Sequence, residues 1–98
     1  MKKESIFQAS LIREIQKRYP GAIVLKNDPD YIQGFPDLTI FCRDRWATLE
    51  CKRSANAPHQ PNQDYYVNLL NDMSYSAFVY PENVEEILEY GLQHAFRS

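Results

Sequence analysis

Apolar residues recur at helical spacing near the start of the chain. They are Phe7, Leu11, Ile12, Ile15 and Tyr19. One face of an α-helix collects positions spaced in this way, so the pattern predicts an amphipathic helix over residues 4–18, ended by Pro20 and Gly21. Glu4 falls inside the apolar arc of this helix. A carboxylate there needs a cation or a hydrogen-bond partner, because burying it alone is costly.

The rest of the chain changes period several times. Strands are predicted at residues 21–27, 37–43, 46–52 and 76–80, and helices at residues 61–73, with Pro61 in the first turn, and 81–96. The order is helix, three strands, helix, strand, helix. We therefore expect an α/β protein of the α+β type, with helices packed on a mixed sheet, in a single domain over residues 1–98.

The second and third strands read as a hairpin with its turn at Asp44 and Arg45. This register places Asp37 opposite Lys52, and it makes Glu50 a diagonal neighbour of Asp37, with Cβ atoms roughly 7 Å apart on the same face. The opposite face is expected to enter the core. Its residues are Leu38, Ile40, Cys42, Leu49 and Cys51.

Composition limits the classes of protein that remain. The formal net charge is −2, with basic residues in excess up to residue 53 and acidic ones in excess after it, so charge neither demands nor excludes a nucleic-acid partner. No stretch approaches the roughly 20 apolar residues of a membrane span, and Glu4 and Gln8 interrupt the place of a signal peptide. We expect a soluble intracellular protein with no membrane association. Cys42 and Cys51 are expected to be buried free thiols rather than a disulfide or zinc site.

The hairpin brings three reactive side chains together. Two carboxylates about 4 Å apart repel by about 4 kcal/mol at an effective dielectric constant of 20, so Asp37 and Glu50 should share a proton or bind a cation. Oxygen ligands favour Mg²⁺ or Mn²⁺. Lys52 beside such an ion would orient a water toward a phosphodiester. The ordinary alternative is an aspartate at a strand start next to a solvent-facing Glu/Lys ladder.

These residues carry a resemblance to a known family. Pro36-Asp37 followed by Glu50-Cys51-Lys52 resembles the signature of the PD-(D/E)xK nuclease superfamily, and the chain is similar to its VRR-NUC branch over roughly residues 4–90. The run from Gly34 to Asp37 matches a glycine-apolar-PD turn of that branch. The resemblance implies an αβββαβ core with an added C-terminal helix. One departure is "NDMSY" before the last strand, where a glycine is expected.

The resemblance also implies roles for individual residues. Asp37, Glu50 and the main-chain carbonyl of Cys51 would ligate the metal, Lys52 would handle the nucleophilic water, Glu4 would support the metal or its waters, and Gln63 would orient a phosphate or water. Glu14 is the substitute for Glu4. Both Glu4 and Gln63 are also ordinary residues for the first turn of a helix.

Other polar and aromatic residues have weaker claims. Arg53 and Lys26 are candidates for phosphate contacts. Three aromatic residues could stack on unpaired bases, although packing is the more usual role: Tyr65, Tyr66 and Trp46. His59 and His94 are expected to be solvated, without a catalytic role.

The combined expectation is a metal-dependent DNA endonuclease with no small-molecule cofactor. It would recognise branched DNA, such as four-way junctions or flaps, as a homodimer in the cytoplasm of a bacterial or phage-infected cell. Two alternatives remain open: a non-catalytic nucleic-acid-binding or assembly module on a nuclease fold, and a restriction-type nuclease subunit that reads a short sequence.

Overall fold

A computed structural model of the chain describes residues 2–97, with side chains from residue 4 onward. Its elements are α1 (Lys2–Arg18), β1 (Ile23–Lys26), β2 (Leu38–Cys42), β3 (Arg45–Cys51), α2 (Gln63–Met73), β4 (Tyr75–Val79), α3 (Val84–Glu86), the π-helical turn η1 (Ile87–Gly91) and α4 (Leu92–Ala95). The order of helices and strands confirms the order predicted from the sequence.

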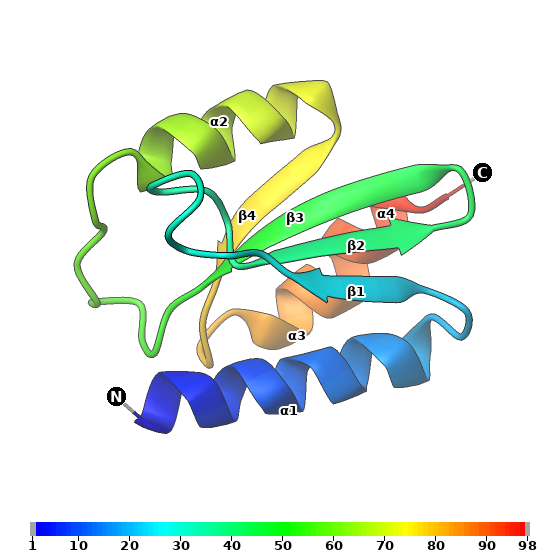
Figure 1. Ribbon diagram of the computed structural model, residues 1–98. Coiled ribbons are helices and arrows are strands. Elements are labelled where there is room, and N and C mark those ends of the chain that lie inside the picture. The colour runs from blue at the N-terminus through cyan, green and yellow to red at the C-terminus, as the bar shows by residue number, and fades with distance from the viewer. Residues whose placement is uncertain (1, 98) are drawn as a thin grey trace.

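The four strands form one mixed sheet in the order β1-β2-β3-β4. The pairs β1–β2 and β2–β3 are antiparallel, whereas β3 and β4 run parallel. A parallel pair needs a crossover connection, and α2 lies in it. In Figure 1, α2 lies on one side of the sheet, while α1 and the C-terminal helices lie on the other. This is the predicted αβββαβ arrangement with an added C-terminal helical segment.

The hydrophobic core lies between the sheet and the helical segments α1, η1 and α4. The strand residues predicted for this face are all buried: Leu38, Ile40, Cys42, Leu49 and Cys51. Leu11 and Ile15 of α1 belong to the same cluster, as do Leu88 and Leu92 near the C-terminus. Full burial of each such Leu or Ile contributes about 1.5–3 kcal/mol. Both cysteines are buried free thiols, as predicted.

The hairpin register differs from the predicted one. Cys42 pairs with Arg45, so the turn consists of Arg43 and Asp44, and the predicted turn at Asp44 and Arg45 is wrong. Arg43 has φ 59, a conformation that tight turns usually assign to Gly or Asn. Its guanidinium donates to the Phe96 carbonyl at 2.8 Å, which fixes the turn against the C-terminal segment. Because the shift is two residues, every strand side chain keeps its predicted face.

Helix α2 also begins later than predicted. Asn62 has φ 73, in the left-handed region, so the helix begins at Gln63 and Pro61 lies outside it. At the other end, Ser74 makes the turn into β4 with φ −150, which is outside the left-handed region that favours glycine. The Ser74 hydroxyl also donates to the Trp46 carbonyl. The expected glycine is therefore unnecessary here.

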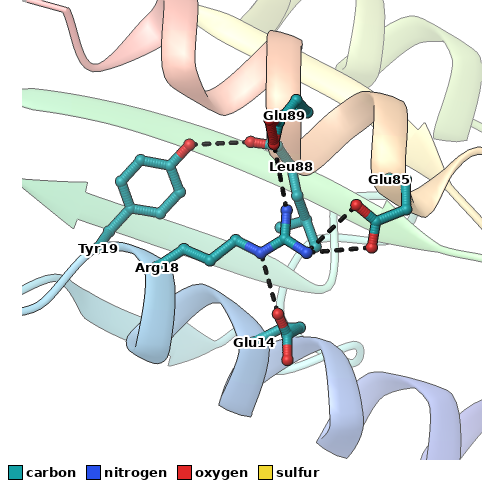
Figure 2. A network of polar contacts seen from close by, with 6 residues as sticks. All are labelled: Glu14, Arg18, Tyr19, Glu85, Leu88 and Glu89. Carbon is teal, nitrogen blue, oxygen red and sulfur yellow. Dashed lines mark hydrogen bonds and ion pairs between the residues drawn. The ribbon is translucent and has the colours of Figure 1, made fainter.

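Polar contacts join the end of α1 to the C-terminal helices (Figure 2). The Arg18 guanidinium lies 2.9 Å from Glu14, 3.0 Å from Glu85 and 3.7 Å from Glu89. The Tyr19 hydroxyl donates to the Leu88 carbonyl at 2.9 Å. The predicted helix over residues 81–96 is present as three consecutive segments, α3, η1 and α4. Every helix within residues 2–97 is too short or too polar to cross a lipid bilayer.

Candidate active site

A cavity of about 340 Å³ lies where β2 begins and β3 ends. It is lined by Glu4, Asp37, Glu50, Lys52, Arg53, Ala57, Pro58, Gln60 and Gln63. Six of the residues selected from the sequence thus lie around one space, although they come from α1, the strands, the loop after β3 and α2.

Asp37 lies at the end of a turn that is fixed by Asn27. The Asn27 amide nitrogen donates to the Pro36 carbonyl and to the Thr39 hydroxyl, both at 2.9 Å. The Asn27 backbone N–H donates to the Asp37 carbonyl at 2.7 Å. The Asp37 carboxylate accepts a hydrogen bond of 2.9 Å from the Cys51 N–H, which ties it to β3. Sequence reasoning missed Asn27, whose only signal is its position at the end of a predicted strand.

The observed register brings Asp37 and Glu50 closer than predicted. Leu38 pairs with Leu49 in antiparallel strands. Asp37, which precedes Leu38, therefore lies opposite Glu50, which follows Leu49. The predicted pairing of Asp37 with Lys52 is wrong, because the hairpin register differs by two residues from the predicted one. Burial raises the pKa of Asp37, against the opposing effects of the Cys51 N–H and of the Lys52 charge.

Glu50 is an unusual residue for its surroundings, because this acidic residue is only 3% exposed. Burial, with the nearby charge of Asp37, raises the pKa of Glu50 to about 8. Its Oε2 accepts a hydrogen bond of 2.8 Å from the Gln63 amide. Its Oε1 is buried without a hydrogen-bond partner among the described residues. A buried carboxylate oxygen without a partner is costly, so this atom is available to a ligand.

Lys52 and Gln63 are buried at the other sides of the cavity. The Lys52 ammonium donates to the Pro58 carbonyl at 3.0 Å, which leaves two of its three protons for other acceptors. The Gln63 oxygen accepts from the Gln60 N–H at 2.7 Å, while its nitrogen donates to Glu50. The Gln63 amide is thereby held in one orientation, toward the carboxylate.

The remaining candidates divide into two groups. Glu4 and Arg53 line the cavity, and the Glu4 charge contributes to the raised pKa of Glu50. Glu14 instead pairs with Arg18 beside the C-terminal helices, so Glu4 is the carboxylate of α1 that lies at the site. Lys26 is exposed at the end of β1 and is not among the lining residues.

The Cys51 thiol takes no part in the cavity. It is fully buried in the core, where burial and the charges of Asp37 and Glu50 raise its pKa above the ordinary value. A neutral thiol on the core side is a poor metal ligand, so only the main chain of Cys51 remains available on the cavity side.

The surroundings of Tyr65, Tyr66 and His59 test what was predicted for these rings. Tyr66 packs against Phe35 at 5.6 Å between ring centroids, as expected for a packing role, while Tyr65 is largely exposed. His59 is not simply solvated. Its ring stacks on Phe78 at 3.9 Å and its Nδ1 lies 2.8 Å from the Asp64 carboxylate.

The donor set fits a hard divalent cation. Asp37 and Glu50 supply two carboxylates, and one Glu50 oxygen has no hydrogen-bond partner from residues 4–97. Within residues 2–97, no group of three or more His, Cys, Asp or Glu side chains is arranged to hold a metal. Mg²⁺ is commonly held by one or two carboxylates and keeps several waters, and Asp37 and Glu50 can supply two carboxylates.

Comparison with known proteins gives one informative result. No protein-family model matches the chain, and no curated protein matches it. A solved structure described as a VRR_NUC domain is similar to it, with a TM-score of 0.73 and 22% sequence identity over 90% of this chain and 96% of that chain. At this identity the similarity shows that the chain has the fold of a VRR_NUC domain.

Proposed function

We propose that this protein is a metal-dependent nuclease that hydrolyses phosphodiester bonds in DNA. The observation that supports it best is the convergence of Asp37, Glu50 and Lys52 in one cavity. The VRR_NUC fold is consistent with this function. An ordinary strand-surface Glu/Lys ladder would be exposed, whereas Glu50 and Lys52 are 3% and 6% exposed.

The side chains around the cavity have distinct tasks in this proposal. Asp37, Glu50 and the Cys51 carbonyl would hold Mg²⁺ or Mn²⁺, with Glu4 acting through water. When bound, such an ion makes a coordinated water more acidic and stabilises negative charge on a phosphoryl group. The two free protons of the Lys52 ammonium orient the attacking water or a phosphate oxygen. Gln63 keeps the Glu50 carboxylate in place, and Arg53 at the rim contacts the DNA backbone.

Replacement of Glu50 or Lys52 by alanine tests this assignment. We expect each variant to cut a synthetic four-way junction in Mg²⁺ at least about 100-fold more slowly, because each removes a group that acts on the transition state. DNA binding, measured by fluorescence anisotropy, should remain. The matched control is Asp44→Ala, at the other end of the hairpin, where the side chain is exposed. Wild-type rates in both site variants would exclude this site.

We propose branched DNA as the substrate class. The fold has no additional recognition domain within residues 2–97, so selectivity would come from DNA shape and backbone contacts. A digestion panel tests this with single-stranded, duplex, flap and four-way junction DNA, each with Mg²⁺, Mn²⁺ or chelator. Faster cutting of one plain duplex sequence than of others would instead support a restriction-type subunit. Calorimetry without any Mg²⁺ or Mn²⁺ binding would support a non-catalytic module.

We also propose that the protein acts as a homodimer. Three exposed apolar side chains share the outer face of the β1–β2 pair, where Ile23 lies opposite Phe41 and Leu25 lies two residues further along. Helix α2 covers β3 and β4 on this side and leaves that pair open (Figure 1). A two-fold pair of sites suits a four-way junction, which presents two strands for cutting. This activity would belong in the cytoplasm of a bacterial or phage-infected cell.

A further inference from the structure

The loop between β3 and α2, residues 53–62, holds both Lys52 and Gln63. Two of its main-chain groups make these contacts: the Pro58 carbonyl accepts from the Lys52 ammonium, and the Gln60 N–H donates to the Gln63 oxygen. Both groups flank a single residue, His59. The loop has no helix or strand of its own, and in Figure 1 it extends to one side of the molecule. Main-chain hydrogen bonds from the Ala57 N–H to the Ser54 carbonyl and from the Gln63 N–H to the Gln60 carbonyl hold two of its turns, and side-chain contacts add to them.

His59 makes two such contacts, on two different elements. Its ring stacks on Phe78 of β4, with the centroids 3.9 Å apart and the planes 15° from parallel. Its Nδ1 lies 2.8 Å from the Asp64 carboxylate in the first turn of α2. A carboxylate only accepts hydrogen bonds, so Nδ1 carries the proton. Phe78 is itself the strand partner of Glu50, so the His59 ring stacks on a residue next to the site carboxylate.

We propose that His59 is a positioning residue, which acts through Pro58 and Gln60 to aim Lys52 and to fix Gln63 on Glu50. The proposal rests on the proposed nuclease function. Lysine has a flexible four-carbon side chain, so the direction of its ammonium depends on the group that accepts its hydrogen bond. His59 itself is not among the residues that line the cavity, so it does not touch the reacting groups.

The kinetic test compares His59→Ala with His59→Phe. The alanine variant should lower kcat about 10-fold or more, because small displacements of catalytic groups cost that much, and should leave KM within about 2-fold. The phenylalanine variant keeps the stacking on Phe78 and should recover most of kcat. Asp64→Asn keeps an acceptor for Nδ1 and should remain close to wild type. The matched control is His94→Ala, an exposed histidine beside Trp46 and Ser74.

A second measurement tests the role of His59 without an assay of DNA cleavage. Hydrogen exchange by NMR on the metal-free protein follows the Gln60 N–H, which donates to Gln63. We expect at least about 10-fold faster exchange of this amide in His59→Ala, with unchanged exchange in β2 and β3, because only the loop opens. Unchanged exchange at Gln60 would overturn the inference.

The two measurements also separate this inference from the proposed function. Wild-type kcat in His59→Ala, in an enzyme that cuts DNA, would overturn the positioning role and leave the nuclease function intact. A wild-type protein that cuts no DNA would refute the proposed function, and the exchange rate of Gln60 would still show whether His59 holds the loop.

Discussion

At the scale of single residues, Glu50 concentrates the energetic cost of the site. It is almost fully buried next to a second carboxylate, and one of its oxygens has no hydrogen-bond partner in the part of the chain that the structure describes. Lys52 and the Gln63 amide offset part of this cost, but the net effect still raises the pKa of Glu50 to about 8. The protein therefore holds a carboxyl group that is costly to ionise at a place where a cation would favour its charged form, as is common at functional sites.

This raised pKa predicts an unusual dependence of stability on pH for the metal-free protein. Between the ordinary pKa of 4.5 and about 8, folded Glu50 binds a proton that the unfolded chain has released. The contribution of Glu50 to the free energy of unfolding should therefore be at its full value below about pH 4.5, and it should fall by up to about 1.4 kcal/mol per pH unit toward pH 8. Urea unfolding in chelator at several pH values measures this fall.

The control for that experiment is Glu50→Gln. Its amide is uncharged at every pH and its oxygen still accepts from Gln63, so its stability should change much less with pH. It should also be more stable than the wild type at pH 8 in chelator. Parallel pH profiles of the two proteins would show that Glu50 titrates normally.

At the scale of elements, α1 is attached to the C-terminal helices by a half-buried hydrogen bond. The Tyr19 hydroxyl donates to the Leu88 carbonyl, and its ring meets Phe96 edge-on at 5.4 Å. Tyr19→Phe keeps the ring but removes the donor, so it should lower the free energy of unfolding by about 1 kcal/mol. Tyr90→Phe, at a residue that is 72% exposed, should have no measurable effect. Equal effects of the two substitutions in urea unfolding would contradict this role.

The elements also show what the sequence could predict. Alternation in β2 and β3 identified the core face and the cavity face, because a strand side chain keeps its face under a shift of two residues. The register itself was missed, since Arg43 rather than a glycine adopts the left-handed conformation in the turn. The hydrophobic pattern within one segment of sequence also cannot predict contacts between loops that are distant in sequence. The close approach of Gly34 to Asn62, where an added Cβ would lie 2.6 Å from the Asn62 Cβ, joins two loops far apart in sequence.

At the scale of the whole molecule, the site is assembled from elements that meet only in the folded chain. Glu4 comes from α1, Asp37 and Glu50 from the hairpin, and Gln63 from α2. In the proposed nuclease, DNA would approach this cavity against a net charge of −2, so the cations near the cavity, Lys52 and Arg53, would carry the local attraction. A small number of phosphate contacts gives weak binding to plain duplex, and a second copy of the site on the same substrate would strengthen binding to branched DNA.

Dimerisation through the open β1–β2 face makes a prediction at this scale. Ile23 is 59% exposed, so Ile23→Lys should leave the melting temperature nearly unchanged. In a two-fold interface the substitution places like charges close together and should weaken association at least about 10-fold. Sedimentation velocity at micromolar concentration measures the change. The wild-type dimer should cut two strands of a four-way junction together, whereas the variant should cut one strand at a time.

Tyr90→Lys supplies the matched control, because Tyr90 is also largely exposed but belongs to η1, among the helices on the other side of the sheet. It should sediment like the wild type. A wild-type protein that is monomeric at this concentration would count against the dimer itself. A wild-type dimer that survives Ile23→Lys would instead exclude this face, since two buried ammonium groups without partners cannot be accommodated in a stable interface.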